Sequence, residues 1–238
     1  MPSHDTSTQP SNHPEAGEIR VIADLPQVTI RSRWVSEMRN NVYLLTSKCS
    51  GTQVLIDAAD SPEAIDELLE SARADTPCEP HVAVIITTHQ HWDHIRALAA
   101  VAETTGAPTA AGAADAEAIA EATGVAPTVV LHHGDTAQFD GISLDVIGLR
   151  GHTPGSVALA YRADDDESPV IFSGDSLFPG GVGNTDQDPQ RFAQLFADVT
   201  ARVFDRYPDD TVVLPGHGDH TTLGAERPHL DEWKQRGW

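Results

Sequence analysis

Seven side chains suited to binding divalent metal ions occur in four short segments of this 238-residue chain. Four of them lie in one run, His89-Gln90-His91-Trp92-Asp93-His94. The other three, His152, Asp175 and His217, each follow an apolar, strand-like segment. Imidazole and carboxylate groups are the ligands that zinc and similar ions prefer. Seven such groups exceed the needs of one tetrahedral ion and suit two, so the pattern predicts a two-metal centre of the kind that activates water for hydrolysis.

The spacing of these residues indicates how they divide between two ions. Residues two apart in an extended segment point the same way, so His89 and His91 are expected to project together. Asp93 and His94 fall where the chain should bend into a helix that starts near His94. The expected ligands are His89, His91 and His152 for one ion, Asp93, His94 and His217 for the other, and Asp175 as a bridge between them.

Strands must carry these ligands to a common point. Runs rich in β-branched and aromatic residues predict strands at 28–34, 41–46, 53–56, 81–87, 170–173 and 211–214, with shorter strands from 129 to 161 and a hairpin turn at Asp140-Gly141. Helices are expected from Ser61-Pro62, over 94–105 and 113–122, and from Pro189 to about Arg206. Because strands and then helices occur in both halves, we expect an α/β fold in which helices cover the outside of two sheets.

Composition narrows the partners that the chain can have. The formal net charge is −21, which repels polyphosphate backbones and anionic membrane surfaces, so we expect a small-molecule substrate, no nucleic acid and no membrane. Cys49 and Cys78 lack metal or redox spacing, which favours a reducing, cytoplasmic compartment, with a single disulfide as the alternative. Residues 1–18 are polar and proline-rich, without the features of a secretory signal; we expect a disordered arm there and one domain over 19–238.

These motifs resemble those of the metallo-β-lactamase fold superfamily. Besides the first run, the matching segments are Gly151-His152-Thr153-Pro154-Gly155, Ser173-Gly174-Asp175-Ser176-Leu177-Phe178 and Pro215-Gly216-His217-Gly218. The resemblance extends from about Ile19 to the C-terminus and implies a four-layer αββα sandwich with the metal site at one edge of the paired sheets. It also implies that Asp57 supports a metal-bound imidazole from beneath, the alternative being an ordinary turn aspartate.

Within the superfamily, the segments around Asp175 and His217 look most like the glyoxalase II-like (hydroxyacylglutathione hydrolase-like) branch. The bridging position is an aspartate, unlike the cysteine of true β-lactamases whose second metal is held by that residue. No large insertion separates Asp175 from His217, so the nuclease branch fits badly. Two departures weigh against glutathione as the thiol carrier: Asn184 stands about where glutathione-thioester hydrolases usually bring an arginine, and 21 residues follow His217.

The resemblance implies hydrolysis of a small thioester by a hydroxide shared between two Zn²⁺ ions, with iron or manganese as other candidate metals. Asp93 is the nearest candidate for a general acid. A lactonase or ester hydrolase, a sulfur dioxygenase with one iron, and a non-catalytic metal-binding or partner-binding protein are the alternatives. The glycine-rich loop from Phe178 to Asn184 is a candidate pocket wall, and His220 could line the pocket or lie on the surface. The acyl group, the thiol carrier and the oligomeric state are left open by the sequence.

Overall fold

The computed structural model describes residues 16–162 and 168–237. Most of the expected N-terminal arm, residues 1–15, lies outside the described residues. Gly17, however, donates its amide to the Trp34 carbonyl at 2.9 Å and accepts from Arg33 Nε at 2.9 Å. These two hydrogen bonds attach the chain to the first sheet slightly ahead of residue 19.

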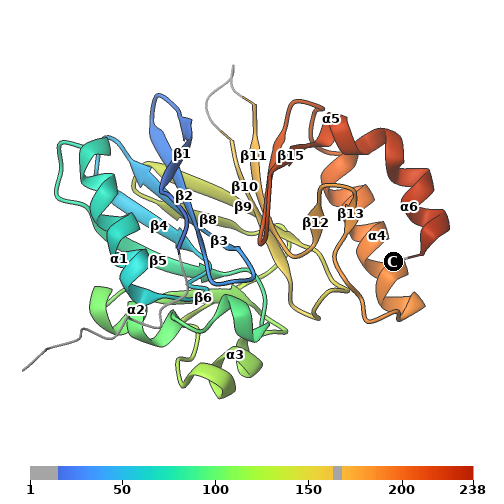
Figure 1. Ribbon diagram of the computed structural model, residues 1–238, viewed down its shortest axis with the longest axis horizontal. Coiled ribbons are helices and arrows are strands. Elements are labelled where there is room, and N and C mark those ends of the chain that lie inside the picture. Colours follow the sequence, from blue (N-terminus) through green and yellow to red (C-terminus); the bar gives the residue numbers. More distant parts are fainter. Residues whose placement is uncertain (1–15, 163–167, 238) are drawn as a thin grey trace, which may run out of the picture.

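A seven-stranded sheet forms the N-terminal half of the fold (Figure 1). Its strands lie in chain order: β1 (Arg20–Asp24), β2 (Val28–Val35), β3 (Asn40–Ser47), β4 (Thr52–Ile56), β5 (His81–Thr87), β6 (Thr109–Gly112) and β7 (Val129–Leu131). The first four are antiparallel neighbours, whereas β4 to β7 run parallel. Parallel neighbours need crossovers, and helices α1 (Pro62–Ser71), α2 (Leu98–Thr105) and α3 (Ala116–Thr123) supply them.

The second sheet has six strands in the order β15-β14-β11-β10-β9-β8. They are β8 (Thr136–Phe139), β9 (Ile142–Gly148), β10 (Val157–Tyr161), β11 (Val170–Gly174), β14 (Val212–Pro215) and β15 (Thr221–Thr222). Strands β11 and β14 are parallel, and the helix α4 (Pro189–Val199) connects them. A small pair, β12 (Leu177–Phe178) and β13 (Gly181–Val182), lies between β11 and α4 in the chain.

Three apolar layers hold the molecule together. Side chains from the inner faces of both sheets form the central layer, where Tyr43 of β3 meets Phe172 of β11 edge to face at 5.3 Å. A second layer joins the first sheet to α1 and α2, and a third joins the second sheet to α4 and α6 (Leu230–Arg236). Figure 1 shows these helices on the two outer faces. The expected four-layer αββα sandwich is confirmed.

Several element boundaries differ from the sequence-based expectations. Ser61 precedes α1 as expected, but its backbone is left-handed, with a φ of 53°, and its side chain makes no capping hydrogen bond. The helix expected from His94 begins at Leu98, since Trp92–His94 form a single 3₁₀ turn. The long helix from Pro189 ends at Val199 and continues as a π-helical turn to Phe204. Strands β1 and β6 and the C-terminal helices were not predicted.

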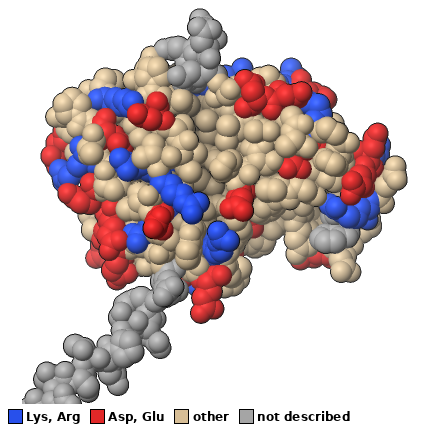
Figure 2. Space-filling view, turned by 45° about the horizontal axis from the view of Figure 1, so that its top comes forward, with Lys and Arg blue, Asp and Glu red and all other residues tan. Residues whose placement is uncertain are grey.

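Charged groups are interspersed on the surface. On the face shown in Figure 2, acidic and basic side chains lie side by side. Surface ion pairs of the described residues include Lys48–Asp24 at 2.6 Å and Arg73–Glu70 at 2.7 Å. Cys49 and Cys78 are both free and exposed. None of the helices in the described ranges combines the length and the apolar character that crossing a bilayer requires.

Candidate metal centre

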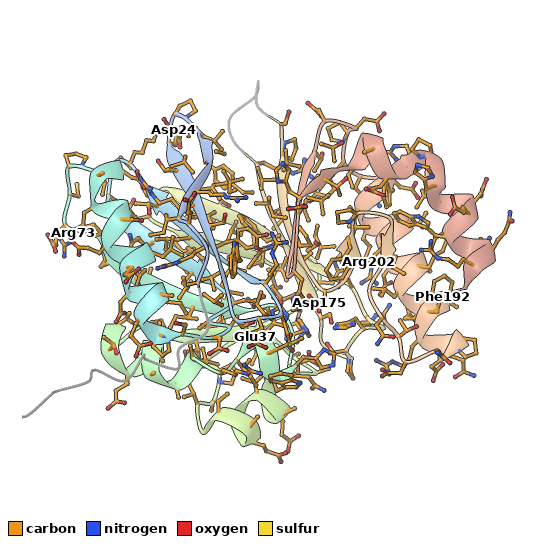
Figure 3. The ribbon with its side chains drawn as sticks, in the orientation of Figure 1. Asp24, Glu37, Arg73, Asp175, Phe192 and Arg202 are labelled. Carbon is orange, nitrogen blue, oxygen red and sulfur yellow. The ribbon has the colours of Figure 1, made fainter. Side chains whose placement is uncertain are left out.

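All seven candidate ligands follow the ends of strands at one edge of the sandwich. The run His89–His94 follows β5, His152 lies between β9 and β10, Asp175 follows β11, and His217 follows β14. Strands β11 and β14 are parallel, so their carboxyl ends, and the residues after them, lie together. Figure 3 shows Asp175 centrally, between the helical layers of the two halves. The four sequence segments therefore converge as expected.

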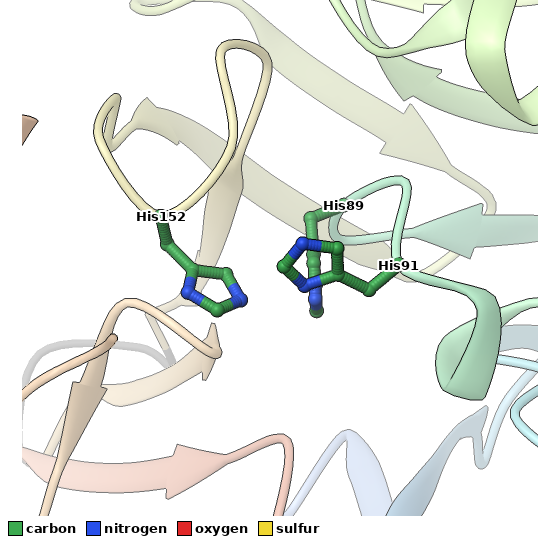
Figure 4. Close-up of side chains that lie close together, drawn as sticks. All are labelled: His89, His91 and His152. Atoms are coloured by element: carbon green, nitrogen blue, oxygen red, sulfur yellow. The ribbon is translucent and has the colours of Figure 1, made fainter. Parts of the chain in front are cut away.

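Three histidines form a first cluster. The ligand atoms of His89, His91 and His152 all lie within 4.8 Å of one another. Their ring centroids are 4.8 Å apart for His89–His91 and His89–His152, and 4.5 Å apart for His91–His152. In Figure 4 the His152 ring, carried on its own loop, faces the other two rings. Three imidazole nitrogens at this spacing could bind one metal ion.

A second cluster contains Asp93, His94 and His217. Nε2 of His217 lies 3.1 Å from Nε2 of His94 and 3.2 Å from Oδ2 of Asp93. Asp175 lies between the two clusters: its carboxylate oxygens are 3.4 Å from His94 Nε2, 3.5 Å from His217 Nε2 and 3.6 Å from His152 Nε2. Asp175 therefore occupies the position expected of a bridge.

The hydrogen bonds of the histidines direct one nitrogen of each ring into the site. Nδ1 of His152 donates to the Asn184 carbonyl at 2.7 Å, and Nδ1 of His217 donates to the Met38 carbonyl at 3.0 Å. A carbonyl oxygen cannot donate, so each Nδ1 carries a proton, and in the neutral form of the ring each Nε2 keeps a lone pair for a metal ion. Nε2 of His89 and of His152 and Oδ1 of Asp175 are buried without a hydrogen-bond partner. Such orphaned acceptors are costly unless a cation meets them, so the residues fit a metal centre.

Asp57 supports ligands of both clusters. Its Oδ2 accepts from His94 Nδ1 at 3.0 Å and from the Thr88 hydroxyl at 2.8 Å. Because that hydroxyl donates to Asp57, it accepts from His89 Nδ1, 3.0 Å away. Asp57 is 2 % exposed and has a φ of 59°. The carboxylate thus contacts one candidate ligand ring directly and a second through the Thr88 hydroxyl, as a supporting role would require.

Electrostatics divide His89, His152, His94 and His217 into two pairs. Burial lowers the pKa of His89 and of His152. Burial alone would do the same to His94 and His217, but neighbouring carboxylates, chiefly Asp175, outweigh it and raise both pKa values to about 10. Burial likewise opposes ionisation of Asp93, yet His217 and His94 hold the pKa of this carboxyl well below its usual range. The carboxyl of Asp93 is therefore ionised at neutral pH.

Two buried polar residues that the sequence did not reveal connect the ligand loops. Asn40 is fully buried at the start of β3, where an isolated bridge pairs it with His217. Asp115, also fully buried, accepts from the Gln90 amide at 3.0 Å, the Thr153 hydroxyl at 2.5 Å and the Gly155 amide at 2.7 Å. Asp115 thus joins the loop after β5 to the loop that carries His152. In the sequence, Asn40 is one of two asparagines at the start of an apolar strand, and Asp115 is an aspartate ahead of a helix. Both patterns are common in proteins, so neither points to a site.

A cleft with a volume of about 580 Å³ opens beside the first cluster. Its lining residues are Gln90, His91, Gly151, His152, Thr153, Pro154, Asp186, Gln190, Arg191 and Gln194. The residues proposed from sequence as pocket walls do not line this particular cleft. Phe178 is half-buried in β12, Asn184 contributes its carbonyl to His152, and exposed His220 lines a separate, small cavity.

The four layers and the histidine–aspartate clusters at one sheet edge define an αββα protein with metal-binding sites. The chain belongs to the metallo-beta-lactamase superfamily, whose family model matches residues 36–217. An uncharacterized protein of Mycobacterium tuberculosis is 31% identical over 207 residues, which cover 79% of this chain and 89% of that protein. A hydroxyacylglutathione hydrolase of Polaromonas is 32% identical over 182 residues, 75% of this chain and 62% of that enzyme.

Solved structures agree with this family. ETHE1 from Myxococcus xanthus superposes with a TM-score of 0.70 at 27% identity, covering 87% of this chain and 84% of that one. TTHA1623, solved in a di-iron-bound form, has a TM-score of 0.61 at 33% identity, covering 82% and 95%. The resemblance to this superfamily inferred from the motifs is confirmed.

Proposed function

We propose that this protein is a hydrolase of small-molecule thioesters that works with two metal ions, zinc being the first candidate. One observation carries the proposal: seven ligand-type side chains from four segments meet, with buried acceptor atoms that have no partner within the protein. The similarity to a hydroxyacylglutathione hydrolase supports the reaction class. The di-iron form of TTHA1623 makes iron the second candidate metal.

The candidate ligands fall into two sets, one for each ion. His89, His91 and His152 would hold one ion, Asp93, His94 and His217 the other, and Asp175 both. Bound ions would polarise the substrate carbonyl and provide a hydroxide near neutral pH. Asp57 and Thr88 hold the rings of His94 and His89 in the tautomer that leaves Nε2 free. The cleft beside His91 and His152 would hold the substrate.

The state of Asp93 favours thioesters over lactones and amides. A group that is ionised at neutral pH is a poor proton donor, and the neighbouring His217 and His94 keep the pKa of Asp93 low. A thiolate leaves without a proton, whereas an alkoxide or an amide nitrogen needs one. The site as built thus suits a leaving group that departs unprotonated.

The test is a panel of acyl thioesters and lactones assayed with protein of measured metal content. We expect thioester turnover that depends on about two ions per chain and is lost in Asp93→Ala. Faster turnover of lactones would favour the lactonase alternative. One iron per chain and oxygen consumption would favour a dioxygenase. Absence of turnover with both ions bound would overturn the proposal.

A further inference from the structure

The cleft beside the first histidine cluster is lined mainly by neutral hydrogen-bonding groups. Gln190 and Gln194 are four residues apart on α4 and so lie on the same side of that helix. Gln90, which lies between His89 and His91 in the sequence, also lines the cleft. Each side-chain amide offers both donors and an acceptor. This lining suits a ligand with hydroxyl or amide groups.

The one arginine among the described lining residues is already engaged. Arg191 donates through Nε to the Gly151 carbonyl at 2.8 Å and through a terminal nitrogen to the His152 carbonyl at 2.5 Å. Its other terminal nitrogen pairs with Asp186 at 2.5 Å. Asp186 thus balances the charge of Arg191, and the two carbonyls hold the guanidinium against the loop that carries His152. The remaining described lining residues include no lysine.

Apart from any ion held by His91 and His152, an anionic ligand would therefore meet no uncommitted lysine or arginine among the described lining residues. It would instead lie near the Asp186 carboxylate, on a chain whose formal net charge is −21. Moving a carboxylate into such a cleft costs free energy unless a cation or several donors compensate it. Long-range repulsion adds to this cost and is screened over roughly 8 Å at physiological salt.

We propose, on the basis of the function proposed above, that this cleft selects a thiol carrier that is electrically neutral and rich in hydroxyl or amide groups. The selecting residues are Gln190 and Gln194, beside the Arg191–Asp186 ion pair, whose two charges sum to zero. Glutathione, which carries a net negative charge at neutral pH, is disfavoured by the same features.

A matched pair of substrates tests the charge preference. S-acetylglutathione and its glycine monoethyl ester share the acyl group and the thiol, but the ester is neutral overall. We expect kcat/KM to be about tenfold higher for the ester. An equal or higher kcat/KM for the charged thioester would overturn the proposal while leaving thioester hydrolysis intact. Turnover of neither substrate would instead count against the hydrolase function itself.

Substitutions on α4 test the residues. Gln190→Lys and Gln194→Lys should each shift the ratio of the two kcat/KM values several-fold towards the charged thioester, because each places a free cation in the cleft. Gln138→Lys is the matched control: it makes the same charge change on exposed β8, outside this cleft. The affinity for S-methylglutathione, measured calorimetrically, should rise in the α4 variants as well. An equal shift in Gln138→Lys, or no shift in the α4 variants, would refute the assignment.

Discussion

The side-chain amide of Asn40 donates to two oxygens of Asp93, the backbone carbonyl at 3.0 Å and Oδ2 at 2.9 Å. The Ser36 hydroxyl donates to Asn40 Oδ1 at 2.6 Å, which fixes the orientation of the amide. The turn between β2 and β3 thereby positions a candidate ligand from the loop after β5.

Replacing Asn40 should weaken metal binding through Asp93. We expect Asn40→Ala to lower zinc affinity about 10- to 100-fold and stability by about 1–3 kcal/mol. Competition with a chromophoric chelator and thermal unfolding measure the two effects. Gln53→Ala is the control, because its amide is also buried and donates to the Thr46 hydroxyl at 3.5 Å, without contacting any ligand segment. Unchanged zinc affinity in Asn40→Ala would contradict the positioning role.

Asp57→Asn should reduce zinc affinity by a similar 10- to 100-fold. The reason is that a neutral amide lacks the negative charge with which the carboxylate stabilises the metal-bound imidazoles. Asparagine tolerates the left-handed backbone of residue 57, so the fold should persist, as circular dichroism can verify. Asp60→Asn, which alters a surface ion pair with Arg96, provides the comparison. If both variants bind zinc equally well, Asp57 does not support the centre.

Zinc loading of the metal-free protein should release protons at pH 7. Neighbouring carboxylates raise the pKa of His94 and of His217 to about 10, above the ordinary 6.5. Because their Nε2 atoms lie 3.1 Å apart and cannot both carry a proton, the pair holds at least one extra proton at pH 7, which must leave when an ion binds. The ion pairs of these histidines stabilise the metal-free fold fully below pH 6.5, and this stabilisation is lost as pH rises through about 10. Zinc affinity changes in the opposite direction and rises with pH. Calorimetry in buffers of different ionisation enthalpy counts the protons. Binding without proton release would show that these histidines are neutral.

Gly216→Ala should damage the centre selectively. A Cβ at this position would lie 2.3 Å from Asp175 Oδ1 and 2.7 Å from His94 Cε1, closer than such atoms approach. We expect loss of at least one bound ion per chain with the secondary structure retained, as seen by metal analysis and circular dichroism. Gly148→Ala is the control, because its added Cβ meets the His133 Cβ at 3.1 Å, away from the ligands. Full metal content in Gly216→Ala would be inconsistent with the described geometry.

Trp233→Ala should destabilise the second half of the sandwich. The indole of Trp233 is 1% exposed and meets Phe204 edge to face at 6.1 Å, so its removal leaves a cavity beneath α6. We expect a loss of about 3–5 kcal/mol in the free energy of unfolding, measured with urea. The exposed Trp92, whose ring stacks on Arg96, gives the comparison: Trp92→Ala should change stability little. Equal effects of the two substitutions would argue against the anchoring role of α6.

The metal clusters could be predicted because several of the candidate ligands lie within one short segment of the chain. Three imidazoles and a carboxylate within six residues have few uses other than metal binding. The run His81–Thr87 was predicted with its observed bounds because a buried parallel strand is almost purely apolar. In both cases the signal lies within one short segment.

What the sequence did not reveal depends on contacts between distant segments. Asp115 is an ordinary helix-preceding aspartate until the loop at 153–155 is folded against it. The contribution of α4 to the cleft beside His152 could not be predicted, because the glutamines in its first turns are indistinguishable in sequence from surface residues. Strand β6 was missed because Thr109–Gly112 is short and rich in small residues, and neighbours on both sides stabilise it.

The shared use of Asp57 has a consequence for how such a centre can change. One carboxylate steadies a ring in each cluster, directly for His94 and through the Thr88 hydroxyl for His89. A substitution at residue 57 therefore disturbs both halves together. Mutations that aim to exchange or remove a single ion should therefore be made at His91, His152, Asp93 or His217, none of which Asp57 contacts directly or through Thr88.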